Sequence, residues 1–380
     1  MMQDKVVLHT LSTGHEVVWH KAVRGIAVDF CAPMRTLSTS LLNGGYREDV
    51  TAVFNHNTGP ADGTHAPLKA PTYVEHLEIT AEEMGLPAAT TTGMGTAASM
   101  ENAAIAVKTY QDLVVSAIAT AGVEGNGGRV GDPAEHYLPG VRLGAHKPGT
   151  INVLLVIDAA LPPGALTRAL VTCTEAKTAA LQELMVGSLY STGLATGSGT
   201  DQTVLVCNPA SPLYFEGAGK HVKLGELIGL AVKEAVKEAL YKQNGLSPQS
   251  QHSVLQRFKR FGLTEETLWE YYDGKARGKV EKDSFLEKLR QWDNEGKAVA
   301  FAAQYAHILD EGDWGLLSEK EVYGAICDLL GTVSFFFGGV VCQPQDGQRE
   351  SCLEALRHWI AACLERRLAY DNVVRRFQRK

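Results

Sequence analysis

The stretch TINVLLVI (residues 150–157) is an almost uninterrupted apolar run, and Pro162-Pro163 follows it after four residues. A short apolar run of this length, bounded by turn residues, predicts a strand that is buried on both faces. Two prolines are typical of a helix start, and the apolar positions that follow lie on one helical stripe as far as about Met185. The sequence therefore predicts a central strand followed by a long helix that covers the sheet.

Several further strands are expected before this helix. Charge-poor runs rich in Val, Thr and Ile alternate with turn residues, as β-strands do. A short helix is expected at Thr80–Gly85, with Thr80 as N-cap and Glu83 completing a capping box, and a second long helix at Leu224–Tyr241. So many strands ahead of the first long helix disfavour a βαβ repeat, and we expect an α+β fold with a mixed or antiparallel sheet layered against long helices. The expected strands are Lys5–Thr10, Glu16–His20, Arg24–Cys31, Arg47–Phe54, Ala103–Tyr110, Asp112–Thr120, Thr150–Ile157 and Asp201–Cys207.

Charge divides the 380 residues into two parts. Residues 1–220 carry 13 Lys and Arg against 20 Asp and Glu, whereas residues 221–380 carry 23 of each. We expect a catalytic domain over residues 1–244, a polar linker at 246–252 and an all-α domain over 250–380. The second domain shows no cluster of catalytic residue types. Its balanced charge and apolar positions at helical spacing suggest an accessory or dimerisation module, so a homo-oligomer is compatible with the sequence.

Composition disfavours several classes of protein. A net charge of −7 and a pI of about 6.0 argue against nucleic acid or an anionic membrane surface as the main partner. The seven cysteines are scattered without a CxxC pair, which disfavours a disulfide framework and a zinc ribbon and favours a reducing cytoplasm. The most apolar stretch, 329–342, is too short for a membrane helix, and the N-terminus lacks the pattern of a signal peptide.

Five segments combine glycine with polar or ionisable residues, which a packed core does not require. Glycine lets a ligand approach the backbone, although a tight turn with a solvated tip is the competing interpretation for each segment alone. Lys177 is distinctive because it falls on the apolar stripe of the first long helix, where it must meet a carboxylate, extend to an edge or serve a site. The segments are 38–45, 55–57, 120–132, 174–178 and 195–201.

Over about residues 20–243, the chain resembles the adenosylcobinamide amidohydrolase family. The resemblance rests on co-linear motifs: TAGVEGN (120–126), GDPA (131–134), PGTIN (148–152), TEAKTAAL (174–181), ATGSGTDQ (195–202) and GKH followed by KLGELIG (219–229). Small-for-small departures occur at Gly127-Gly128 and Ser198. The resemblance implies an enzyme that hydrolyses the amide between aminopropanol and a propionyl side chain of the corrin ring. Its products would be adenosylcobyric acid and 1-aminopropan-2-ol, and it would act in cobalamin precursor salvage.

Amide hydrolysis requires an activated nucleophile, donors for the oxyanion and a proton for the leaving amine. We assign acid/base work to Glu124, with substrate binding or a structural turn as its alternatives, and also to His56. Asn43, with the backbone amides of Gly44 and Gly45, is a candidate oxyanion hole, and Lys177 is a further catalytic candidate. The residues expected to bind substrate, besides those two glycines, are Asn57, Asn126, Arg129, Asp132, Glu175, Thr196, Ser198, Thr200, Asp201 and His221.

Three alternatives remain open. Covalent catalysis by Thr200 or Thr120, with Lys177 as base, competes with activated water. A metal site is a third mechanism, but its candidate ligands have no ligand spacing, so no metal is expected and no cofactor beyond the cobalt that the substrate carries. A non-catalytic corrinoid-binding or trafficking protein is the alternative function. The candidate ligands are His56, Asp62, His65, Glu124, Asp132 and His136.

Overall fold

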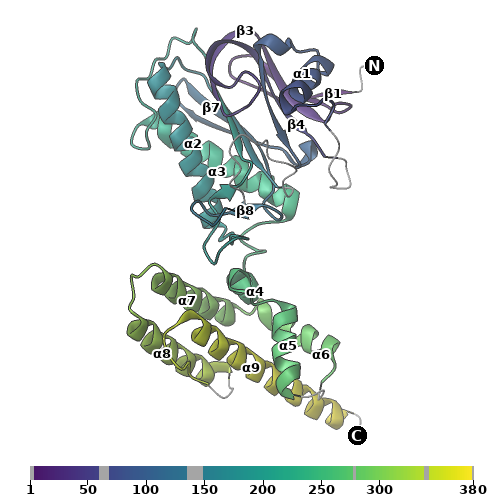
Figure 1. Cartoon of the computed structure of the whole chain (residues 1–380), viewed down its shortest axis with the longest axis vertical. Helices are drawn as coiled ribbons and strands as arrows, with labels where there is room; N and C mark the ends of the chain where they lie inside the picture. The colour runs from purple at the N-terminus through teal and green to yellow at the C-terminus, as the bar shows by residue number, and fades with distance from the viewer. Residues whose placement is uncertain (1–3, 60–67, 135–148, 277–279, 338–341, 379–380) are drawn as a thin grey trace. The chain divides into compact units, whose positions relative to one another are not determined.

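The computed structural model describes residues 4–59, 68–134, 149–276, 280–337 and 342–378. The chain divides into two compact units, residues 1–247 and 248–380 (Figure 1).

Nine strands of the described part of the first unit form one sheet. Its order is β1-β2-β3-β11-β9-β7-β6, with β4 paired to β3 and β5 paired to β4. The β9–β11 and β4–β5 pairs are parallel and the others are antiparallel, so the sheet is mixed. The strands are β1 Lys5–Thr10, β2 Glu16–His20, β3 Gly25–Ser38, β4 Gly45–Asn57, β5 Thr91–Thr96, β6 Ala104–Tyr110, β7 Leu113–Ala121, β9 Ile151–Ile157 and β11 Gln202–Cys207.

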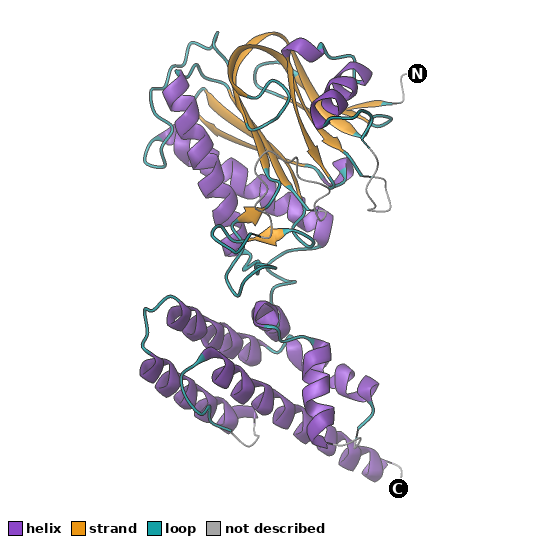
Figure 2. Cartoon of the chain, in the orientation of Figure 1, coloured by secondary structure: helices purple, strands orange, loops and turns teal. Residues whose placement is uncertain are grey.

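Helices cover both sides of this sheet (Figure 2). The helix α1 (Tyr73–Glu83) packs on β3 and β4, whereas α2 (Pro163–Glu183) and α3 (Lys223–Asn244) pack on β6, β7, β9 and β11. Successive side chains of a strand point to opposite faces, so β9 contributes to two cores. Val153 and Leu155 pack against α2 and α3, while Leu154 packs among residues of β3, β4 and β11. The α+β prediction is confirmed.

The first helix differs from the prediction. A helix is present at residues 80–83, but its predicted start with Thr80 as N-cap is wrong, because α1 begins eight residues earlier, after Thr72. Thr72 and Glu75 form the capping box, in which Glu75 N donates to Thr72 Oγ1 over 3.2 Å and Thr72 N donates to Glu75 Oε2 over 3.0 Å. Thr80 lies buried inside the helix and donates to the carbonyl of His76. Two TxxE patterns occur eight residues apart, and the one that starts the helix follows Pro71.

The strands β3 and β4 are longer than the sequence predicts, since they pair with each other from Gly25–His56 to Ser38–Gly45. On its other edge, β3 pairs with β2 near Gly25–Val28 and with β11 near Arg35–Ser38. Because it pairs with both strands, β3 joins the β1–β2 hairpin to β11 and the strands beyond it. Short 3₁₀ helices at Ala88–Thr90 and Met100–Asn102 flank β5.

The described secondary-structure elements of the second unit are all helices. Its core contains Trp292, Tyr305 and Trp359, and Arg260 forms a buried ion pair with Asp310. Within the described residues, no helix is both long and apolar enough to cross a membrane. The helices are α4 Val254–Phe258, the 3₁₀ turn Lys259–Phe261, α5 Glu265–Ala276, α6 Lys282–Asp293, α7 Gly296–Asp313, α8 Glu319–Phe337 and α9 Arg349–Gln378.

Candidate active site

A pocket with a volume of about 790 Å³ lies in the first unit, beside α2. Two very short strands, β8 (Gly127–Gly128) and β10 (Gly197–Ser198), pair with each other and form part of its wall. The lining residues come from three separate segments of the chain: Asn126 to Ala134, Thr174 to Thr178, and Tyr190 to Asp201.

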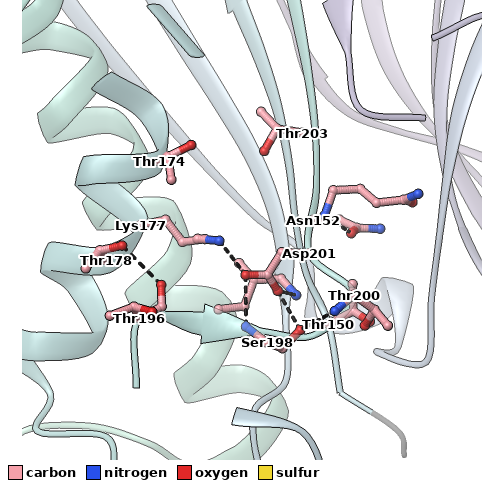
Figure 3. Close-up of polar contacts among 12 residues, drawn as sticks. Thr150, Asn152, Thr174, Lys177, Thr178, Thr196, Ser198, Thr200, Asp201 and Thr203 are labelled. Atoms are coloured by element: carbon pink, nitrogen blue, oxygen red, sulfur yellow. Dashed lines mark hydrogen bonds and ion pairs between the residues drawn. The ribbon is translucent and has the colours of Figure 1, made fainter. Parts of the chain in front are cut away.

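A charged pair borders this pocket. Lys177 of α2 forms an ion pair with Asp201, and only 13% and 10% of the two side chains are exposed (Figure 3). Asp201 also accepts hydrogen bonds from Ile151 N (2.8 Å) and Ser198 Oγ (2.6 Å). The lysine on the apolar stripe has thus met a carboxylate, which compensates for its removal from water.

Gly197 lies against this pair. A Cβ atom at Gly197 would lie 2.9 Å from Lys177 Nζ and closer still to Asp201 Oδ2. A side chain at this position would therefore force one of the two charged groups to shift.

Hydroxyl and amide groups form a network beside the charged pair. Asn126 Oδ1 accepts from the Tyr190 hydroxyl over 3.1 Å, and Asn126 Nδ2 lies 3.5 Å from Thr200 Oγ1. Thr200 Oγ1 is 2.6 Å from Thr150 Oγ1, and Thr150 is buried (Figure 3). Thr150 directly precedes β9, so the network lies at the N-terminal start of this central strand.

Arg129 and Asp132 form the rim of the pocket. Asp132 Oδ2 accepts from Arg129 N (2.8 Å) and Ser188 Oγ (2.6 Å). Partial burial raises the pKa of the Asp132 carboxyl, but hydrogen bonds from Ser188, Ser191 and Arg129 outweigh it and lower the pKa overall. Asp132 is therefore a carboxylate that fixes the loop after β8.

The structure brings together about half of the site residues expected from the sequence. Thr200 adjoins the pocket through Asn126. Glu124, Glu175 and His221 are exposed and do not line the pocket, and Glu175 pairs instead with Lys220. The expected residues that line it are Asn126, Arg129, Asp132, Lys177, Thr196, Ser198 and Asp201.

The segment proposed as an oxyanion hole is a turn between β3 and β4. Asn43 Nδ2 donates to the carbonyls of Ala88 and Thr91, both over 2.8 Å, and its Oδ1 accepts from Arg47. Gly45 has φ +79°, a conformation that glycine adopts readily, and a Cβ at Gly44 would collide with the backbone of Ser40. These groups are engaged in structure and lie outside the pocket lining.

His56 lies in β4 under α1, with only 2% of its surface exposed. Burial, with the nearby charges of Lys69, His76 and Arg24, lowers its pKa to about 3. The ring centroids of His56 and His76 are 5.4 Å apart. His56 is thus neutral and does not line the pocket.

Two further expected residues are also interior. Asn57 donates to Ala98 O and accepts from Gly59 N, which fixes the end of β4. The rival nucleophile Thr120 is buried on β7, where its hydroxyl accepts from Asn55 Nδ2 over 2.8 Å. Both side chains are committed to the fold, whereas the other rival, Thr200, lies beside the pocket.

Among the described residues, no group of three His, Cys, Asp or Glu side chains is arranged to hold a metal ion. Three of the ligands considered above, Asp62, His65 and His136, lie outside the described residues.

Sequence reasoning missed Thr150, Asn152 and Tyr190. Thr150 and Asn152 are the polar residues of the run TINVLLVI, and a polar residue in a buried strand needs a partner. Asn152 donates to Asn55 Oδ1 and accepts from Gln202 N inside the sheet. That signal was available in the sequence. Tyr190 lies outside the quoted motifs, and no pattern in the sequence pointed to it.

One comparison with known proteins identifies a family. The family model for adenosylcobinamide amidohydrolase matches residues 8–248. An uncharacterized protein of Methanocaldococcus jannaschii, MJ1613, is 39% identical over 162 residues, which are 40% of this chain and 63% of that protein. The chain therefore spans less than two thirds of the length of this relative.

Two solved structures show weaker likeness. The PH0078 protein from Pyrococcus horikoshii OT3 matches over 69% of this chain and 92% of its own, with 13% identity and a TM-score of 0.32. A Burkholderia sp. beta-aminopeptidase matches over 57% and 78%, with 15% identity and a TM-score of 0.29. The family match covers more than half of the chain, and the chain belongs to the adenosylcobinamide amidohydrolase family.

Proposed function

We propose that this protein hydrolyses the amide that joins aminopropanol to a propionyl side chain of the corrin ring in adenosylcobinamide. Adenosylcobyric acid and 1-aminopropan-2-ol would be the products. The observation that carries the proposal is the convergence of separate family motifs on one pocket. Residues of TAGVEGN, GDPA, TEAKTAAL and ATGSGTDQ, far apart in the sequence, all line it.

The chemistry of the pocket suits amide hydrolysis. The reaction needs a nucleophile, donors for the developing oxyanion and a proton for the leaving amine. Thr150 and Thr200 supply hydroxyls, Asn126 supplies an amide N–H, and Lys177, held by Asp201, supplies a positive charge beside them. The partly exposed rim around Arg129 offers donors for the amide side chains of a corrinoid.

The setting of the reaction follows from the substrate. The corrinoid brings its own cobalt, so we expect no separate cofactor. The product would return to cobalamin synthesis, which makes salvage the role of the enzyme. The spacing of the cysteines favours the cytoplasm.

The direct test is to incubate the full chain with adenosylcobinamide and to follow both products by mass spectrometry. Release of adenosylcobyric acid and aminopropanol in equal amounts is expected. Tight binding with adenosylcobinamide recovered intact after long incubation would contradict the enzyme and support the corrinoid-binding alternative.

A pair of tyrosine variants links the activity to the pocket. Tyr190→Phe removes the hydroxyl that orients Asn126, so we expect kcat to fall about 10-fold, the worth of one hydrogen bond of about 1.4 kcal/mol, with KM less affected. Tyr241→Phe is the matched control, because Tyr241 is 57% exposed on α3. Equal kcat in both variants would show that this hydrogen bond of the pocket takes no part in the reaction.

A further inference from the structure

Hydrogen-bond donors converge on one backbone carbonyl beside the pocket. The carbonyl oxygen of Gly149 lies 2.8 Å from Thr150 Oγ1, 2.9 Å from Thr200 Oγ1 and 3.3 Å from both Ser198 Oγ and Asn126 Nδ2. Each hydroxyl has one proton, and the proton of Ser198 goes to Asp201 over 2.6 Å. With Thr150 donating to Thr200 over 2.6 Å, the donors to Gly149 O are Thr200 Oγ1 and Asn126 Nδ2, one for each lone pair of the carbonyl oxygen. Donors gathered in this way stabilise the negative charge that develops when a nucleophile attacks the carbonyl carbon.

The hydroxyl closest to this carbonyl belongs to the next residue. Thr150 is 5% exposed, and its Oγ1 is also 2.6 Å from Thr200 Oγ1. The following amide, Ile151 N, donates to Asp201 Oδ1 and fixes the start of β9. Thr150 is thus held on its C-terminal side by the sheet and by the charged pair.

The residue on the other side of the peptide bond is held as well. Gly149 has φ +139°, which residues with a side chain rarely adopt, and a Cβ there would lie 3.2 Å from Asn126 and from Gly122 O. Glycine is the residue that this arrangement accepts.

We propose that the chain cleaves its own peptide bond between Gly149 and Thr150. Thr150 Oγ1 bonds to the carbonyl carbon of Gly149, the C–N bond breaks, and the hydroxyl proton passes to the departing nitrogen, which leaves an ester. Water then hydrolyses the ester. Its oxygen ends in the carboxylate of Gly149, and Thr150 regains its hydroxyl and carries a free α-amine.

Cleavage has two consequences for the site. The donors that Gly149 O occupies become available to a substrate carbonyl, and the α-amine of Thr150 becomes a base next to its own hydroxyl, as in N-terminal threonine hydrolases. The fragments stay together, because β9 pairs with β7 from the first fragment and with β11 from its own. This second step rests on the proposed function, whereas the cleavage itself does not.

The experiment is a time course of the purified full chain without corrinoid, read under denaturing conditions by intact mass and N-terminal sequencing. We expect the 41.0-kDa chain to give fragments of residues 1–149 and 150–380. The second should begin with Thr-Ile-Asn-Val, and the masses should sum to the whole plus one water. Thr150→Ala should stay whole, Thr150→Ser should still cleave, and Asn126→Ala should cleave about 10²-fold more slowly because it loses one oxyanion donor.

Thr167→Ala, on the exposed face of α2, is the control and should cleave like the wild type. A folded wild-type chain that stays whole, or Thr150→Ala cleaved at the wild-type rate, would overturn the proposal. The two proposals fail separately. A chain that cleaves but leaves adenosylcobinamide intact overturns only the proposed function, and an uncleaved chain that releases adenosylcobyric acid overturns only self-cleavage.

Discussion

Two regions of the first unit bury polar side chains, and they differ in how those groups are partnered. Beside the pocket, Lys177 and Asp201 are charged, and hydrogen bonds to Ser198 and Ile151 hold the carboxylate. Under α1, His56 is buried, and neither of its ring nitrogens makes a well-formed hydrogen bond to a described residue. A buried charge is tolerated only when it is paired, whereas an imidazole can lose its charge and pack as an aromatic ring. The first region holds an ion pair beside the pocket, and the second has become part of the core.

Breaking the pair of Lys177 and Asp201 should have the largest effect on stability. Asp201→Asn leaves Lys177 in its largely buried position without a counter-charge, and we expect the free energy of unfolding to fall by about 3 kcal/mol. Urea unfolding measures this value. Glu226→Gln, which breaks the exposed pair with Lys223, is the control and should cost at most about 1 kcal/mol.

The double variant Lys177→Met with Asp201→Asn should recover part of that loss, since no charge is then left unpaired. If Asp201→Asn lowers the free energy of unfolding no more than Glu226→Gln does, the buried pair contributes no more to stability than the exposed pair.

A smaller effect is expected from steric pressure on the same pair. Gly197→Ala places a methyl group against Lys177 and Asp201, and overpacking of this kind costs about 2 kcal/mol. Gly217→Ala is the matched control, because an added Cβ there meets nothing within 4 Å. Equal thermal unfolding of the two variants would show that the pair yields easily.

The buried histidine under α1 should make the free energy of unfolding depend on pH. The pKa of His56 falls from 6.5 to about 3 on folding, so the unfolded chain gains a proton below pH 6.5 that the folded chain does not accept. This contribution to stability is complete above pH 6.5 and is lost as pH falls towards 3, by about 1.4 kcal/mol per pH unit. Burial also lowers the pKa of His76, which acts in the same direction.

Urea unfolding at pH 7, 6 and 5 measures this slope. His56→Gln should have a shallower slope than the wild type, whereas His221→Gln, an exposed histidine, should keep it. Identical slopes in all three proteins would mean that His56 titrates normally in the fold.

The smallest effect is expected at Glu124. Its side chain is exposed and does not line the pocket, so Glu124→Gln should change kcat by less than about 2-fold. General acid–base catalysis is worth about 10²–10⁴-fold. A fall of that size with KM intact would restore Glu124 to proton transfer, as the sequence suggested, and would move the reaction out of the pocket.

Local patterns predicted most of the fold, because the alternation of a strand and the periodicity of a helix can be recognised within a few consecutive residues. The hairpin of β1 and β2 and the helix after Pro162-Pro163 were anticipated in this way. The start of α1 was missed because two capping patterns compete locally, and only the packing on β3 and β4 decides between them. The sheet order was out of reach, since β11 joins β3 and β9 from distant parts of the chain.

The candidate site was foretold in part for the same reason. Lys177 was recognisable from its place on an apolar stripe, but its partner Asp201 lies 24 residues away and was found only in three dimensions. Glycine-rich polar segments look alike in sequence whether they shape a pocket or a turn. The segments at 126–132 and 196–201 line the pocket, while 43–45 closes a turn.

A structure of the wild-type chain with adenosylcobyric acid bound tests the central claim most directly, because the carboxylate of this product marks the position of the cleaved amide. The account predicts that this carboxylate lies in the pocket, within about 3 Å of Asn126 Nδ2. A carboxylate found beside Glu124 or anywhere else outside the pocket would contradict it.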